Sequence, residues 1–173
     1  APASQQAAAD NGQPYPFFLA HALEAAVESL GPCGGWFVEG KYDGIRAQAV
    51  KRGGRVWLWS RGEELISEGF PDALVALASL PDGTVLDGEL LVWPEGADQP
   101  APFALLQKRL NRKTLGKKLL ADAPVRFVAY DLLEDAATDI RALPQHERRT
   151  RLEARLHGSA VALSPLLQAS DWP

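Results

Sequence analysis

The feature that most constrains the fold is a pair of apolar runs joined by a tight glycine turn. Residues 45–51 place Ile45, Ala47 and Ala49 on one face and polar side chains on the other. A period of two is typical of a half-buried β-strand. RGGR at 52–55 follows, and its glycines suit the positive φ angles of a hairpin turn. Because VWLWS at 56–60 indicates a returning strand, the chain is predicted to contain an antiparallel sheet.

Further strands and helices are expected on both sides of this hairpin. Residues 36–40 are apolar and indicate a strand ending at Lys41, which would place the lysine in a turn between two strands. Other strands are predicted at 84–93 and 124–134, and helices at 71–80, 102–121 and 144–157. Hairpins first and helices between later strands favour an α+β fold, with antiparallel sheets flanked by helices.

Length and composition limit the classes of protein that the chain can represent. Its 173 residues, 46% of them hydrophobic, are enough for one domain with a core. The net charge of −4 requires any polyanion site to be local. No apolar stretch is long enough for a membrane span, and a single cysteine fits a reducing cytoplasm. Residues 1–14 are predicted to be a linker, and the lack of any methionine suggests a piece of a longer protein.

The segment EGKYDGIR at 39–46 carries the candidate chemistry. A lysine is a possible nucleophile, but its ordinary pKa of about 10.4 means that its charge must first be disfavoured or its proton removed. The neighbouring cations Arg46 and Arg61 would disfavour that charge, whereas Asp43 would favour it unless a metal ion occupied the carboxylate. Gly44 would let the backbone turn closely around a ligand. Taken alone, the motif could also be an exposed hairpin turn.

Three more motifs follow in order: SRGEE at 60–64, LDGEL at 86–90 and FVAYDLL at 127–133. Together with EGKYDGIR they resemble the covalent nucleotidyltransferases, and in particular the adenylation domain of ATP-dependent DNA ligases. The sequence between the motifs is similar to that of bacterial ligases associated with Lhr-family helicases. The resemblance implies a partial adenylation domain at 15–173 with a nucleotidyltransferase (ATP-grasp-like) fold and the nucleotide in a groove between sheets.

The resemblance also implies a role for each matching residue. Lys41 would attack the α-phosphate of ATP and become lysyl-AMP, AMP would pass to the 5′-phosphate of a nick, and the 3′-hydroxyl would seal it. Asp43 and Glu89 are the candidate ligands of Mg²⁺, and Asp131 would orient neighbours or contact metal-bound water. The expected nucleotide contacts are Glu39, Gly40, Tyr42, Arg46, Arg61, Glu89 and Tyr130.

The wider context is implied in the same way. The expected partner is nicked double-stranded DNA, and the expected setting is the bacterial cytoplasm near the nucleoid, in DNA repair, replication or recombination. We expect a monomer. The family has two later motifs, an EG-containing strand and a K-x-K strand, which this sequence lacks, and the flanking DNA-binding and OB-fold domains are expected elsewhere in the same protein.

The run QKRLNRKTLGKK at 107–118 concentrates six of the eighteen basic residues. In an acidic chain it is the best local candidate for phosphate contact, although a solvated helix face explains it equally well. The expected DNA contacts are Lys108, Arg109, Arg112 and Lys113.

Two alternative functions stay open from the sequence. An RNA ligase or an mRNA-capping-type enzyme shares the lysine chemistry, although the text between the motifs favours a DNA ligase. A non-catalytic module that binds a nucleotide or a partner protein is the second alternative, because the later motifs are absent.

Overall fold

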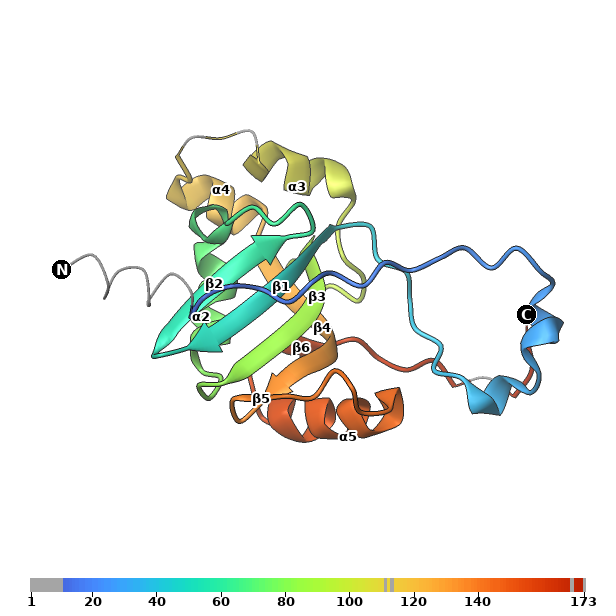
Figure 1. Ribbon diagram of the computed structural model, residues 1–173. Coiled ribbons are helices and arrows are strands. Elements are labelled where there is room, and N and C mark those ends of the chain that lie inside the picture. The colour runs from blue at the N-terminus through green and yellow to red at the C-terminus, as the bar shows by residue number, and fades with distance from the viewer. Residues whose placement is uncertain (1–10, 111, 113, 169, 173) are drawn as a thin grey trace.

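The computed structural model describes residues 11–110, 112, 114–168 and 170–172. Its centre is a sheet with the strand order β2-β1-β3-β4-β5, and β6 pairs with β4 in parallel (Figure 1). The other pairings are antiparallel. The strands are β1 (Ile45–Arg52), β2 (Arg55–Ser60), β3 (Thr84–Val92), β4 (Val125–Asp135), β5 (Thr138–Asp139) and β6 (Ala162–Leu163). The predicted α+β fold is confirmed, although the described strands form one sheet and not the several antiparallel sheets expected.

The β1–β2 hairpin forms where the alternating pattern predicts it. Gly53 and Gly54 make the turn with φ values of 56° and 74°, in the left-handed region that glycine occupies without steric cost. Arg52 lies opposite Arg55, so the four-residue segment closes the hairpin. Ile45, Ala47 and Ala49 contribute to the main core, as their spacing predicts.

In the described part of the chain, four α-helices pack around the sheet: α2 (Pro71–Ala78), α3 (Phe103–Leu110), α4 (Lys117–Asp122) and α5 (Gln145–Leu156). Short 3₁₀ helices form at Val27–Leu30, Cys33–Gly35 and Ser67–Gly69. The single helix predicted at 102–121 is wrong, because Gly116 has an extended backbone and begins α4 as a separate helix. Figure 1 shows α3 and α4 together at one end of the sheet and α5 at the other, beside β5.

The strand predicted at 36–40 is also wrong. Its residues form only an isolated bridge, between Glu39 and Leu166, and a backbone bond from Leu167 to the carbonyl of Val38. Trp36 and Phe37 stay exposed, since this segment lies on an arm that extends away from the sheet (Figure 1). Lys41 therefore lies on the extended segment leading into β1, and not in a hairpin turn.

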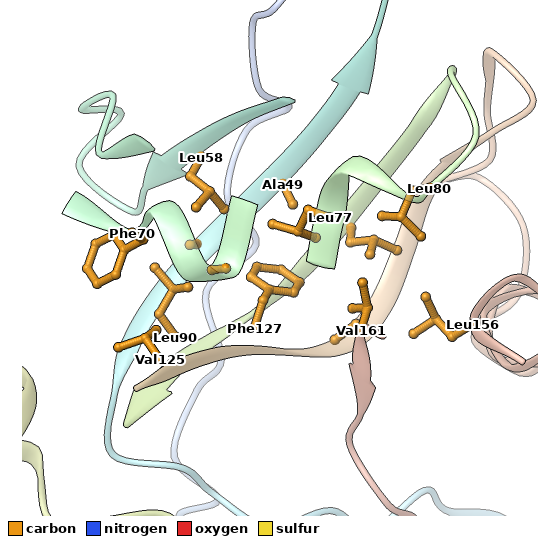
Figure 2. Close-up of a cluster of buried hydrophobic side chains, with 14 of the residues drawn as sticks. Ala49, Leu58, Phe70, Leu77, Leu80, Leu90, Val125, Phe127, Leu156 and Val161 are labelled. Carbon is orange, nitrogen blue, oxygen red and sulfur yellow. The ribbon is translucent and has the colours of Figure 1, made fainter. Parts of the chain in front are cut away.

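The main core lies between α2 and one face of the sheet. Figure 2 shows Leu58, Leu77, Leu90 and Phe127 pointing toward one another there. Each of these side chains is almost fully buried. At about 25 cal/mol per Å² of apolar area, such burial is the main favourable contribution to folding.

The opposite face of the sheet is covered by residues 11–18, named here the N-terminal strap. A small apolar cluster of Val50, Val85 and Leu133 lies under it, and Trp57 and Trp59 pack against this cluster. Figure 1 shows the strap crossing the sheet as the blue segment.

Hydrogen bonds to β1, β2 and β4 attach this strap to the strands beneath it. Trp59 Nε1 donates to the carbonyl of Gly12 at 2.7 Å. Tyr15 exchanges two hydrogen bonds with the buried amide of Gln48, at 2.9 and 2.8 Å.

Of the helices in the described part of the chain, none has the length and apolar content that a bilayer span requires.

Candidate active site

The segment that carries Lys41 is held against β3 by a close backbone approach at Gly44. A Cβ at this position would clash with the carbonyl oxygen of Leu90 and the side chain of Glu89. The backbone N–H of Gly44 also acts on the Glu89 carboxylate and lowers its pKa. Gly44 is thus required for contact with β3, whereas the sequence suggested contact with a ligand.

Glu89 on β3 is the charged group most clearly linked to Lys41. Burial, the largest cause, raises the pKa of Glu89 to about 7, and the negative charge of Asp87 adds to this increase. The N–H of Gly44 and the positive charges of Arg46 and Lys41 act in the opposite direction. The exposed ammonium of Lys41 therefore lies within electrostatic reach of a half-buried carboxylate.

Arg46 lies on the same sheet face as Glu89, its cross-strand partner. Its guanidinium forms a two-pronged ion pair with the buried Asp87: Nε lies 3.2 Å from Oδ1 and Nη2 lies 2.6 Å from Oδ2. Nη1 donates to the carbonyl of Phe18, and the Phe17 ring lies 5.6 Å from the guanidinium carbon. Such paired geometry fixes both the place and the orientation of the Arg46 charge.

A register shift between β3 and β4 places Tyr130 and Asp131 beside Asp87. Burial, and next the negative charge of Asp87, raise the pKa of the Tyr130 hydroxyl well above its usual value. Asp131 accepts two hydrogen bonds from Arg148 of α5, at 2.9 and 3.0 Å. An irregularity in the ladder thus brings β4 side chains and a helix cation into the same site.

A cavity of about 780 Å³ lies over this face of the sheet. Three of the predicted nucleotide contacts, Glu39, Arg46 and Tyr130, line this cavity. Four residues at positions 16–20 also line it. Its lining consists of Pro16, Phe17, Phe18, Ala20, Glu39, Arg46, Asp87, Tyr130, Asp131, Leu133, Arg141, Gln145 and Arg148.

Several predicted site residues lie outside this lining. Arg61 is exposed in the turn after β2, and Asp43 is exposed on the segment before β1. Tyr42 packs near Trp93, with ring centroids 6.4 Å apart. Lys41, Gly40 and Glu89 do not line the cavity either. The structure therefore divides the predicted residues between the cavity and the adjoining Lys41 segment.

Sequence reasoning missed the two adjacent arginines of α5. Arg149 is buried and donates to Glu39 at 3.3 Å, to Glu153 at 2.7 Å and to the carbonyl of Ser164 at 2.9 Å. Of these contacts, only the ion pair between Arg149 and Glu153 could be predicted from the sequence, because the two residues are four positions apart on one helix. The contacts of Arg148 and Arg149 with the cavity residues Asp131 and Glu39 depend on how α5 packs.

The expected DNA-binding cluster is only partly exposed. Arg109 is 2% exposed, and its guanidinium pairs with Asp72 at 2.7 and 2.8 Å and donates to the carbonyls of Gly69 and Ala123. This burial contradicts a DNA contact for Arg109. Lys108 and Arg112 are exposed, and Lys113 lies outside the described residues.

The described residues contain no cluster of three or more His, Cys, Asp or Glu side chains that could hold a metal ion by themselves. Asp87 is occupied by Arg46, which leaves Glu89 as the half-buried carboxylate whose pKa the charge of Lys41 affects. One carboxylate is consistent with Mg²⁺ only if nucleotide phosphates and waters supply the other ligands, which is its usual mode of binding beside phosphates.

Comparison with known proteins is consistent with this geometry. The curated relatives include a probable DNA ligase of Opitutus terrae, 46% identical over 74% of this chain and 12% of that protein. A probable DNA ligase of Koribacter versatilis is 37% identical over 91% of this chain and 27% of its own length. The present chain thus spans well under half of each relative.

A solved structure supports the fold independently. The mycobacterial DNA ligase D complexed with ATP and MES superposes with a TM-score of 0.61 and 27% identity, over 76% of this chain and 40% of that one. The model of the ATP dependent DNA ligase domain matches residues 17–170, which include the Lys41 segment, the cavity residues of β1, β3 and β4, and α5. The chain therefore belongs to the ATP-dependent DNA ligase domain family.

Proposed function

We propose that this chain forms the lysyl-AMP intermediate of an ATP-dependent DNA ligase. The observation that carries the proposal is the position of Lys41. Its charge acts on Glu89, and Glu39, two residues before it, lines the cavity together with Arg46, Asp87 and Tyr130. Nζ of Lys41, after losing a proton, would bond to the α-phosphorus of ATP. The bond from this phosphorus to the α–β bridging oxygen would break, and pyrophosphate would leave.

The residues of the chain contribute mainly position and charge to this step. Phosphoryl transfer depends on positioning and charge stabilisation more than on covalent chemistry by the protein. The Arg46 guanidinium, held by Asp87, would present a fixed positive charge toward the phosphates or the ribose. Tyr130 would lie against the adenine, and Glu39 would be held at the cavity wall by Arg149.

Glu89 would contribute a metal ligand or accept a hydrogen bond from a ribose hydroxyl. When bound, Mg²⁺ would neutralise charge on the phosphates. A cation near Glu89 would favour the ionised carboxylate, whose charge is otherwise disfavoured by burial. Asp43 is exposed on the Lys41 segment and would contact metal-bound water.

The later steps of ligation are part of the same proposal. AMP would pass from Lys41 to the 5′-phosphate of nicked double-stranded DNA, and the 3′-hydroxyl would then displace AMP. The exposed Lys108, Arg112, Lys117 and Lys118 of the α3–α4 region are the candidate contacts to the DNA backbone.

Intact-mass spectrometry after incubation with ATP and Mg²⁺ tests the first step. We expect an acid-labile mass increase equal to AMP on the wild-type chain and none on Lys41→Ala. Lys108→Ala is the matched control, because it removes another exposed lysine on α3, and it should form the adduct normally. An adduct on Lys41→Ala would show that another residue is the nucleophile, and no adduct on the wild-type chain would contradict lysyl-AMP formation.

A further inference from the structure

The side chain of Phe18 is 82% exposed although it borders the cavity. Exposed apolar surface that continues into a hollow can mark a ligand-binding groove. The neighbouring Phe17 is half-buried beneath the Arg46 guanidinium and already has a partner. The Phe18 ring is therefore the aromatic surface at this cavity that is most open to a ligand.

The backbone that carries Phe18 is held firmly on the sheet. Its carbonyl accepts a hydrogen bond from Arg46, and the preceding Tyr15 bonds through its backbone to Gln48. The Tyr15 hydroxyl also donates to Glu134 at 2.6 Å. An aromatic ring on so well anchored a segment loses little conformational entropy when a ligand binds to it.

The chemistry of the cavity indicates the kind of ligand. Pro16, Phe17, Phe18 and Ala20 form an apolar side, and Tyr130 contributes a second aromatic ring. Charged and amide groups, among them Glu39, Gln145 and Arg148, lie in the same lining. A flat heteroaromatic ring with donors and acceptors along its edge matches both kinds of surface, as in other sites where bases stack on aromatic side chains.

We propose that Phe18 is a nucleobase-stacking residue of the nucleotide site, so that the N-terminal strap, residues 11–18, forms part of the binding site. This inference rests on the proposed function, which supplies ATP as the ligand. Arg46 links the two parts of the site, since its guanidinium donates both to the backbone carbonyl of Phe18 and to the carboxylate of Asp87.

Isothermal titration of the 173-residue chain tests the proposal, with ATP and inorganic tripolyphosphate as the two probes. Phe18→Ala should weaken ATP binding on the order of tenfold, the usual effect of losing one base–aromatic stack. Binding of tripolyphosphate, which has no base, should not change. Phe18→Trp retains an aromatic face and should bind ATP about as tightly as the wild type.

Val75→Ala on α2 is the matched control, because Val75 is 77% exposed and lies away from the cavity. The melting temperatures of Phe18→Ala and Val75→Ala should both stay close to the wild-type value, since neither side chain is buried. This comparison separates a loss of ligand contact from a loss of folding.

Each contrary result has a distinct meaning. Unchanged ATP affinity in Phe18→Ala would overturn the stacking role while leaving lysyl-AMP formation intact. An equal loss for ATP and tripolyphosphate would also overturn it, since the ring would then act on the phosphate site and not on the base. A wild-type chain that binds no ATP would contradict both this inference and the proposed function.

Discussion

The surroundings of Glu89 in the folded protein could not be predicted from its neighbours in the sequence. LDGEL marks it as a strand residue, but only the sheet places it against the N–H of Gly44, under the influence of Lys41 and Asp87. With a pKa of about 7, its carboxyl is close to half protonated at neutral pH when no ligand is bound. Binding of a cation beside it would release that proton.

The raised pKa of Glu89 predicts a pH-dependent stability. Between pH 4.5, the ordinary pKa, and about 7, the folded protein keeps a proton that the unfolded chain has lost, so the free energy of unfolding falls as pH rises. Glu89→Gln removes this loss. The free energy of unfolding of the variant, measured relative to that of the wild type, should therefore be about 1–3 kcal/mol higher at pH 8 than at pH 4. The partial exposure of the carboxyl limits the size of this difference. Urea unfolding at the two pH values measures this gain, and an equal difference at both would contradict the raised pKa.

Arg109 illustrates the same dependence on environment for a cation. The basic run predicts DNA contact, whereas the structure buries its guanidinium against Asp72 and two backbone carbonyls. We expect Arg109→Met to lower the free energy of unfolding by about 3–5 kcal/mol, because one half of a buried ion pair is lost. Arg112→Ala, at an exposed position of the same run, should change it by less than about 0.5 kcal/mol. Chemical denaturation compares the two, and similar small losses would contradict the burial of Arg109.

At the scale of elements, the approach of the Lys41 segment to β3 decides where the candidate nucleophile lies. Sequence pattern predicts a hairpin here, but the structure has an extended segment whose position depends on Gly44 against Leu90. The packing of α5 acts similarly on the other side, where Arg148 and Arg149 hold Asp131 and Glu39.

Gly44→Ala should therefore displace the Lys41 segment from β3. We expect a loss of about 1–3 kcal/mol in the free energy of unfolding, because a methyl group cannot fit beside the Leu90 carbonyl. The lysyl-AMP adduct should also form more slowly. Gly34→Ala is the control, since a Cβ there meets no atom within 4 Å and its φ is not positive. Chemical denaturation and mass spectrometry of the adduct compare the two variants. Wild-type stability and wild-type adduct formation in Gly44→Ala would contradict the close approach of Gly44 to Leu90.

At the scale of the whole molecule, the charge is unevenly distributed. The chain carries a net charge of −4, yet the α3–α4 end exposes Lys108, Arg112, Lys117 and Lys118. Figure 1 places this end away from α5. A local basic surface on an acidic protein can direct the DNA backbone to one end of the molecule.

Lys117→Ala should weaken DNA binding and lower the salt dependence of the binding constant by about one unit of log–log slope, because one phosphate contact is lost. Arg151→Ala on α5 is the control and should leave the slope unchanged, since Arg151 is exposed at the other end. Fluorescence anisotropy with nicked duplex DNA at several salt concentrations measures both. Equal slopes for all three proteins would argue against the α3–α4 region as the DNA contact.

Local sequence determined the elements whose signals are short-range. The β1–β2 hairpin, α2, β3, β4 and α5 all form close to their predicted bounds, because alternation, glycine turns and helical spacing act between near neighbours. The order of the four motifs was likewise sufficient to indicate the ligase family, which the family match confirms.

Tertiary structure alone decided which residues meet. The pairing of Arg46 with Asp87 joins residues 41 positions apart, Tyr15 reaches Glu134 across 119 positions, and Arg149 reaches Glu39 across 110. No period or spacing records such contacts, since they arise from strand order, the β4 register shift and the packing of α5. The residue types of the four motifs therefore set the chemistry available to this protein, and the packing of distant segments sets how that chemistry is arranged around Lys41.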